Sequence, residues 1–314
     1  MPANLTPQFM AAEEAYKRAT TPEETLAALE EMLRQIPKHK GTEKMQADIK
    51  RRIARVREVG EAARKKGRVD PYRVEKEGAG QIFVVGPPNS GKSALVGALT
   101  SARVVVTDYP FATSAPVPGM MRHENVLIQL VDTPPFTADN FPPAMAASFR
   151  NGDGLLLVID ASSDDCLEKL DESLSLLKGG KALAEGKFLK VIASKADAPG
   201  AADNMEFLGE TFPQLCIIDV SIRDGTNLAN LPELLFHALG VVRAYSKPPG
   251  KQPDKNSPFI LKAGSTVEHM AEAIHRDLPR TMKGARVWGS AKFDGQSVPR
   301  EHILADGDIV EFRT

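Results

Sequence analysis

The stretch GPPNSGKS, residues 86–93, restricts most strongly what this chain can fold into. It follows the apolar run QIFVV and leads into SALVGAL, so it predicts a strand, a tight loop and a helix in succession. Its spacing fits G-x-x-x-x-G-K-[ST]. Gly91 lets the backbone curl so that N–H groups converge on a phosphate, Lys92 reaches the outer phosphate oxygens, and the Ser93 hydroxyl ligates Mg²⁺. The stretch therefore predicts a triphosphate site.

Short apolar runs recur along the middle of the chain, alternating with helical or loop segments. They lie at 81–86, 126–131, 155–160, 188–193 and 215–220. Such runs are typical of strands buried on both faces of a mostly parallel sheet. Residues 79–245 are therefore predicted to form an α/β, doubly wound domain.

Residues 1–78 have a helical pattern. At Thr6-Pro7 and Thr21-Pro22, an N-cap residue precedes a proline at the first helical position. Thr42 caps a further helix. The apolar stripes of the last two helices predict an antiparallel helical hairpin.

The C-terminal part of the chain divides into a linker and a small module. Residues 246–258 contain four prolines and three lysines, which is typical of a linker. Strand patterns and one helical pattern in residues 259–314 predict a small α+β unit.

Three further segments end or follow predicted strands and add to a nucleotide site. Asp132 ends a buried strand, where it can hold Mg²⁺ through water. In SKAD, residues 194–197, Asp197 can accept two hydrogen bonds from guanine, a donor pair that adenine lacks. Lys195 would lay its aliphatic stem along the base. After the next strand, the backbone of Ser221 and Ile222 could meet the guanine oxygen.

The motifs stand in an order that resembles the Obg-like branch of the translation-factor-related GTPases. They are GPPNSGKS, YPFAT (109–113), DTPPF (132–136), SKAD and VSIRDG (220–225). The segment IPKHKGTEKMQADIKRRIARV resembles the N-terminal region of the developmentally regulated GTP-binding proteins. GSTVEHMAEAIHRDL, ARVWGSAKFDGQSV and LADGDIVEF resemble a TGS domain, a ubiquitin-like β-grasp module. The resemblance implies a P-loop NTPase G domain between the helical hairpin and a TGS domain, without the extra domain of eukaryotic members.

The resemblance also implies roles for single residues. Thr113 would be the switch I threonine that meets Mg²⁺ beside Ser93 and Asp132, and with Lys92 it would be catalytic. Asn89 either coordinates K⁺, as in potassium-stimulated GTPases, or stabilises the loop through its amide. The implied nucleotide contacts are Gly86, Pro87, Pro88, Asn89, Ser90, Gly91, Lys92, Ser93, Ala94, Asp132, Ser194, Lys195, Asp197, Ser221 and Ile222.

Three residues depart from the family pattern. Pro135 replaces the glycine of Asp-x-x-Gly and has no N–H for the γ-phosphate. Phe136 stands where many GTPases keep a water-orienting Gln, although a hydrophobic residue here is usual for the Obg-like branch. Ser194 replaces the Asn of Asn-Lys-x-Asp and is shorter. These departures predict slow intrinsic turnover and leave guanine binding intact.

A basic run covers residues 38–68, with twelve Lys or Arg against four acidic residues, in a chain of net charge −1. Such a run either contacts a polyphosphate backbone or is a solvated helix face. The family resemblance favours ribosomal RNA.

The remaining features concern location and function class. Two cysteines without metal-ligand spacing, and no apolar run of about 18 residues, predict a reduced cytoplasmic protein with no membrane span. Two functions stay open: a slow, Mg²⁺-dependent GTPase switch, or a nucleotide-gated ribosome-binding module that hydrolyses little. ATP use is a third alternative, which Asp197 opposes.

Overall fold

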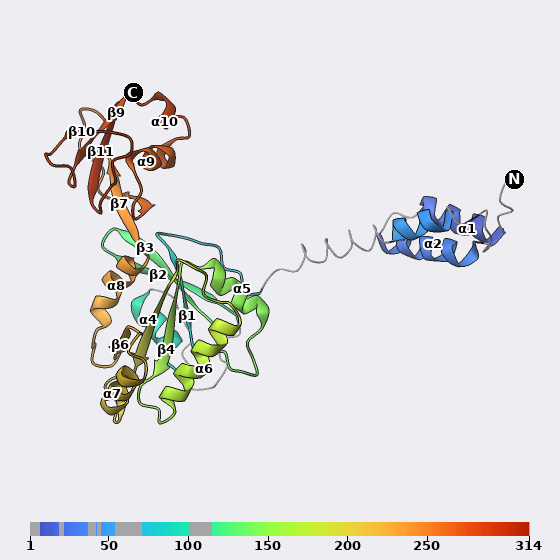
Figure 1. Cartoon of the computed structure of the whole chain (residues 1–314), viewed down its shortest axis with the longest axis horizontal. Helices are drawn as coiled ribbons and strands as arrows, with labels where there is room; N and C mark the ends of the chain where they lie inside the picture. The colour runs from blue at the N-terminus through green and yellow to red at the C-terminus, as the bar shows by residue number, and fades with distance from the viewer. Residues whose placement is uncertain are drawn as a thin grey trace. The chain divides into compact units, whose positions relative to one another are not determined.

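The computed structural model describes residues 7–18, 22–36, 42, 45–53, 71–100 and 115–313. The chain divides into two compact units, Met1–Asp70 and Pro71–Thr314. No helix in the described ranges is long and apolar enough to cross a bilayer. Figure 1 shows the elements of each unit.

The described residues of the first unit are mainly helical, as the sequence predicts. Helices α1 (Pro7–Arg18) and α2 (Pro22–Gln35) both begin at the prolines that follow a threonine. Residues 45–53 are also helical, and the Gln46 backbone N–H donates to the Thr42 carbonyl at 2.9 Å. One apolar cluster joins all three segments, so α1 adds to the predicted hairpin; its buried members are Phe9, Ala12, Leu29, Met32, Ile36, Ile49 and Ile53.

The second unit begins with a six-stranded sheet in the order β2-β3-β1-β4-β5-β6. Only β2 runs antiparallel to its neighbour, so the predicted α/β class is confirmed. The strands are β1 (Gln81–Val85), β2 (Val117–His123), β3 (Val126–Asp132), β4 (Gly154–Asp160), β5 (Phe188–Ser194) and β6 (Ile217–Val220).

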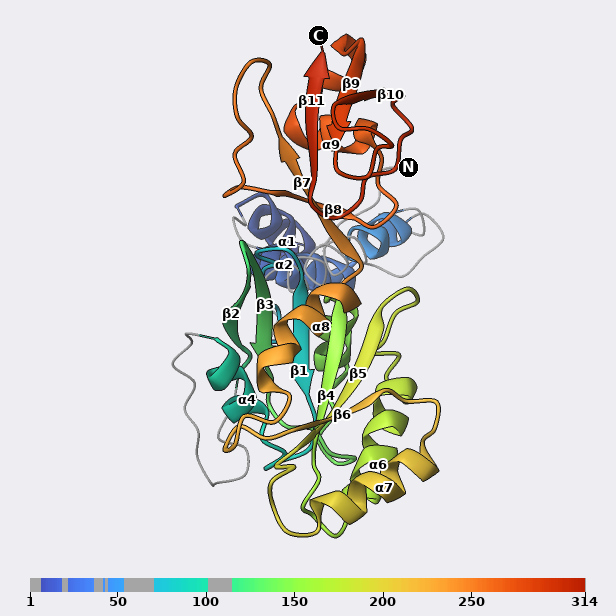
Figure 2. The ribbon, with the colours of Figure 1, turned by 90° about the vertical axis from the view of Figure 1, so that its left-hand side faces the viewer.

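Helices cover both faces of this sheet. One apolar cluster packs α5, α6 and α7 against one face, and a second cluster packs α4 and α8 against the other. Figure 2 shows α8 crossing in front of the strands. Alternate residues of each strand feed the two clusters, which explains the continuous apolar runs. The helices are α4 (Lys92–Leu99), α5 (Pro143–Asn151), α6 (Cys166–Gly179), α7 (Ala201–Thr211) and α8 (Leu231–Ala238), the last preceded by the 3₁₀ turn η1 (Leu228–Asn230).

A second, five-stranded sheet has the order β10-β9-β11-β7-β8 and packs on α9. Its first strand, β7, pairs with β8 and β11, so the predicted boundary between residues 245 and 246 falls inside a strand. Residues 247–258 therefore connect an antiparallel strand pair within this module rather than joining two domains. The elements are β7 (Val241–Ser246), β8 (Phe259–Lys262), α9 (Val267–Ile274), α10 (Leu278–Thr281), β9 (Gly284–Trp288), β10 (Gln296–Val298) and β11 (Asp308–Arg313).

Arg243 on β7 connects the two sheets of this unit. Its guanidinium pairs with Glu124, in the turn between β2 and β3, and with Asp306, before β11. It also lies over the ring of Phe236 on α8, 5.1 Å from the ring centroid. Nearby, the Asn125 amide donates to the Tyr245 hydroxyl at 2.7 Å. The β2–β3 turn is thus held by side chains of β7.

Candidate nucleotide-binding site

The loop Gly86–Ser93 lies between β1 and α4 and has the backbone that the pattern requires. Gly91 has φ +89° immediately before the helix, and Gly86 has φ +146°. A Cβ on Gly86 would lie 2.2 Å from the carbonyl oxygen of Val158, so a larger residue has no space there. The loop therefore curls against β4 at the carboxyl end of β1.

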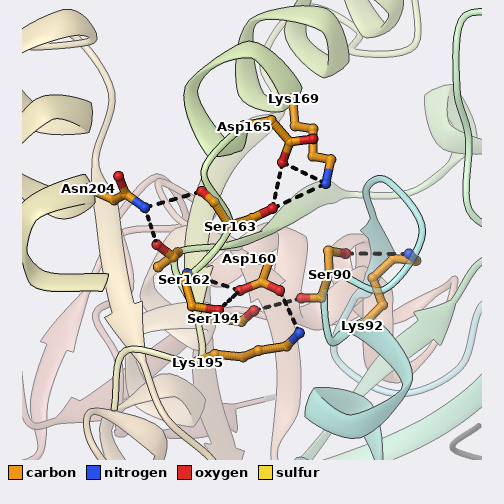
Figure 3. Close-up of polar contacts among 11 residues, drawn as sticks. Ser90, Lys92, Asp160, Ser162, Ser163, Asp165, Lys169, Ser194, Lys195 and Asn204 are labelled. Carbon is orange, nitrogen blue, oxygen red and sulfur yellow. Dashed lines mark hydrogen bonds and ion pairs between the residues drawn. The ribbon is translucent and has the colours of Figure 1, made fainter. Parts of the chain in front are cut away.

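Lys92 is buried inside this loop. Its exposed fraction is 6%, and its ammonium donates to the Pro87 carbonyl at 2.7 Å and to the Ser90 hydroxyl at 3.5 Å. Figure 3 shows the lysine folded back toward Ser90. Burial lowers the pKa of Lys92 to about 8, and the negative charge of Asp132 opposes that shift. An anion that entered the loop would meet a cation with little access to water.

Ser93 and Asp132 supply oxygen atoms at one point of the site. The Ser93 hydroxyl donates to Asp132 Oδ2 at 2.7 Å, and Asp132 is fully buried at the end of β3. The adjacent Thr133 hydroxyl donates to the Val84 carbonyl at 2.8 Å and fixes this strand end against β1. A hydroxyl and a carboxylate are hard oxygen ligands, so these two residues fit the chemistry of a Mg²⁺ site.

The SKAD segment lies beside the phosphate loop and bonds to it. Ser194, the last residue of β5, is buried, and its hydroxyl donates to the Ser90 carbonyl at 2.7 Å (Figure 3). The Asp197 carboxylate accepts from the Ser221 hydroxyl at 2.7 Å, and the Arg223 guanidinium lies 3.7 Å away. The segments after β5 and β6 thus meet around the Asp197 carboxylate.

Asp160 also lies beside the SKAD segment, and the sequence motifs do not predict it. It ends β4, and Lys195 Nζ lies 2.5 Å from its Oδ2. An Asp that ends an apolar run, as Asp132 does, is the signal that points to it, but no motif includes it.

Phe136, in the segment after Asp132, has its side chain in the apolar core and not at the phosphate loop. Phe136 is 1% exposed and lies in the core between the sheet, α5 and α6, with its ring centroid 5.0 Å from that of Phe141 and 6.4 Å from that of Phe149. Its backbone N–H donates to the Gly86 carbonyl at 3.4 Å. Pro135 is buried and has no N–H to donate.

The other predicted residues lie around the same sheet edge or outside the described ranges. Asn89 is exposed with φ +59°, and Ile222 is 40% exposed after β6. Pro88 is half-buried in the loop, and Ala94 lies in the first turn of α4. Thr113 is outside the described residues, as is most of the basic run 38–68, of which Lys50, Arg51 and Arg52 are described and exposed.

Comparison with known proteins agrees with this geometry. Residues 81–192 match the family described as 50S ribosome-binding GTPase, and residues 242–314 match the TGS domain. An uncharacterized GTP-binding protein of Methanocaldococcus jannaschii is 27% identical over 358 positions, covering 92% of each chain. Developmentally-regulated G-protein 2 of Arabidopsis thaliana is 27% identical over 92% of this chain and 90% of its own length. The chain is a homologue of the developmentally regulated GTP-binding proteins.

This homologue is shorter within the aligned region than its relatives. The alignment with the Methanocaldococcus protein spans 358 positions, more than the 314 residues of this chain, so that relative contains residues with no counterpart here. A GTP-binding protein of Sulfolobus solfataricus, solved with GDP, has a TM-score of 0.42 and 21% identity over 73% of this chain and 70% of its own.

Proposed function

We propose that this chain binds GTP and GDP and hydrolyses GTP slowly, as a Mg²⁺-dependent switch. One observation carries the proposal: the loop Gly86–Ser93 is joined on one side to Asp132 through Ser93 and on the other to the SKAD segment through Ser194. Phosphate, metal and base contacts would then come from the ends of β1, β3, β5 and β6, at one edge of the mostly parallel sheet.

The chain's own residues would act by positioning and by charge. Lys92 would leave the Pro87 carbonyl and donate to oxygens of the outer phosphates, where its positive charge offsets charge that develops on the transferred group. Ser93 and Asp132 would hold Mg²⁺, which supplies further positive charge at the phosphate oxygens. We assign no general base, because such sites work mainly by positioning and electrostatics.

Two residues support the alternative of a nucleotide-gated binding module with little hydrolysis. Pro135 lacks the N–H that would meet a γ-phosphate, and the Phe136 side chain is held in the core, so neither orients water. GTP would then still bind through the phosphate loop and Asp197. The two functions differ only in turnover, which makes them separable by measurement.

Calorimetry tests nucleotide binding directly. Full-length protein is titrated with GDP, GTP and ATP in Mg²⁺, together with Lys92→Ala and the control Lys169→Ala, which replaces a half-buried lysine of α6. We expect both guanine nucleotides to bind wild type and Lys169→Ala, with ATP weaker and Lys92→Ala strongly impaired. Equal binding of GTP by wild type and Lys92→Ala would remove the proposal, and ATP preferred over GTP would overturn the base assignment.

Single-turnover hydrolysis then separates the switch from the gated module. GTP turnover is followed in K⁺ and in Na⁺, with wild type and Asn89→Asp. Asn89 is exposed in a left-handed conformation and makes no hydrogen bond to another described residue through its side chain, which supports a K⁺ role. Turnover that rises in K⁺ for wild type alone supports this role, whereas negligible turnover in both salts, also with ribosomes present, selects the gated module.

Charge and composition support a proposal for the partner and the location. We propose contact with ribosomal RNA through the basic residues 38–68, because a segment with a net positive charge attracts a phosphate backbone. The two cysteines form no disulfide, which fits the reducing cytoplasm. Co-sedimentation with ribosomes, compared between a non-hydrolysable GTP analogue and GDP, tests the contact, and equal absence of binding in both states would exclude it.

A further inference from the structure

Asp160 holds the ammonium of Lys195 at the base side of the site. Asp160 ends β4 and pairs in register with Ser194, the residue before Lys195. Lys195 Nζ lies 2.5 Å from Asp160 Oδ2, and Figure 3 shows the extended lysine stem running back toward this carboxylate. The ion pair therefore spans two neighbouring strand ends, one of which begins the predicted guanine-binding segment.

The carboxylate of Asp160 is itself fixed. Its Oδ1 accepts hydrogen bonds from the Ser162 backbone N–H at 3.0 Å and from the Ser162 hydroxyl at 2.7 Å. Burial acts to raise the pKa of Asp160, but hydrogen bonds from Lys195 and Ser162 outweigh it and keep this pKa below its usual range. The Asn204 amide donates to the carbonyls of Ala161 and Ser163, which braces the same loop (Figure 3). The charge opposite Lys195 thus has a defined place.

Lys195 is held at both ends. Its backbone is left-handed, with φ +58°, which few non-glycine residues adopt. Its side chain is 45% exposed, so burial alone does not hold the stem, and the contact with Asp160 does. Between these two fixed ends lie the four methylene groups along which the base would rest.

We propose that Asp160 is a positioning residue for guanine: it holds Lys195 extended, so that the lysine stem forms a preset surface for the purine. The inference rests on the proposed binding of guanine nucleotides and extends it to a residue outside the motifs. Without the carboxylate, the exposed lysine samples other rotamers, and binding must order it again. We expect affinity to fall by about three- to tenfold. The loss should be equal for GDP and GTP, because Lys195 lies at the base and not at the γ-phosphate.

A double-mutant cycle tests whether Asp160 acts through Lys195. The variants are Asp160→Asn, Lys195→Met and the double variant, with binding and release of a fluorescent GDP measured by stopped flow. Lys195→Met keeps an aliphatic stem and removes the ammonium. We expect each single variant to weaken binding to a similar extent and the double variant to lose no more than either. If Asp160 has only a structural role, Asp160→Asn should weaken binding as much in the Lys195→Met variant as it does in wild type.

Asp165→Asn is the matched control, because Asp165 lies in the same loop and also pairs with a lysine, Lys169, at 2.8 Å. We expect it to bind GDP as wild type does.

Wild-type affinity in Asp160→Asn, or tighter binding because Lys195 is released, overturns the inference while guanine binding stands. A wild type that binds no guanine nucleotide overturns the proposed function instead. If Asp160→Asn is too unstable to assay, Lys195→Met still tests the platform, and unchanged affinity there overturns it.

Discussion

The hydroxyl of Ser194 donates a hydrogen bond of 2.7 Å to the carbonyl oxygen of Ser90. One residue belongs to the predicted base segment and the other to the phosphate loop, 104 positions earlier. Ser194 is 5% exposed and Ser90 1% exposed, so water cannot replace the bond easily. A serine therefore makes the connection between base and phosphate segments here, although the family pattern has an asparagine at this position.

Ser194→Ala should weaken both folding and nucleotide binding. The change leaves the buried Ser90 carbonyl without this donor, which costs about 1–3 kcal/mol. We expect the free energy of unfolding in urea to fall by that amount and GDP release to accelerate. Ser163→Ala, which removes an exposed hydroxyl bonded to Asp165, is the control and should change neither quantity. An unchanged urea midpoint in Ser194→Ala would show that the bond contributes nothing.

Phe136→Gln should fail to create a faster GTPase. Because the Phe136 side chain packs among aromatic rings in the core, a glutamine there loses apolar contacts instead of reaching a water near the phosphates. We expect loss of about 3–5 kcal/mol in unfolding free energy and no rise in single-turnover hydrolysis. Phe293→Gln is the control, because Phe293 is 66% exposed and should be replaceable without loss. Faster hydrolysis in folded Phe136→Gln would show that this segment rearranges when nucleotide binds.

Local patterns were enough to predict most of the fold and the phosphate loop. Buried strands appear as apolar runs, and the glycines of the loop mark a backbone that other residues cannot adopt. Edge strand β2 escaped prediction because Pro118 and Gly119 interrupt its pattern. Strand β7 was not predicted either. It follows α8 directly after Gly240, so its apolar residues continue the apolar run of that helix.

Long-range side-chain pairs could not be predicted. Lys195 meets Asp160 across 35 positions, and Arg243 meets Glu124 across 119, so only the folded chain brings them together. The sequence does show that Phe136 lacks an amide, but the burial of its ring depends on α5 and α6 and is visible only in three dimensions.

Arg243→Ala should loosen the β2–β3 turn and the start of β11 together. The Arg243 side chain is 12% exposed, and its Nη2 lies 2.6 Å from Asp306 Oδ2. Removing the guanidinium leaves Asp306 and Glu124 without their shared cation. We expect roughly tenfold faster hydrogen exchange in peptides covering residues 122–127 and 304–308. Arg280→Ala, an exposed arginine of the same module, should leave exchange unchanged.

An effect of Arg243→Ala on only one of the two peptides would contradict a shared junction. Arg243→Lys distinguishes charge from geometry. A lysine keeps the positive charge but cannot donate from several fixed positions, so we expect it to restore little of the protection. Full protection in Arg243→Lys would show that charge alone holds the turn.

Nucleotide binding should take up a proton at mildly alkaline pH. Burial lowers the pKa of Lys92 to about 8 in the nucleotide-free chain, and phosphate charges beside its ammonium raise that pKa again. At pH 8 about half of the molecules must therefore gain a proton on binding, whereas at pH 6.5 almost none must. GDP affinity should accordingly fall as pH rises above 8.

Calorimetry in two buffers of different ionisation enthalpy measures the proton uptake. Lys195→Met, which alters the other lysine of the site, should leave the proton uptake unchanged. If wild type takes up no proton at pH 8, Lys92 is already fully protonated before the nucleotide binds.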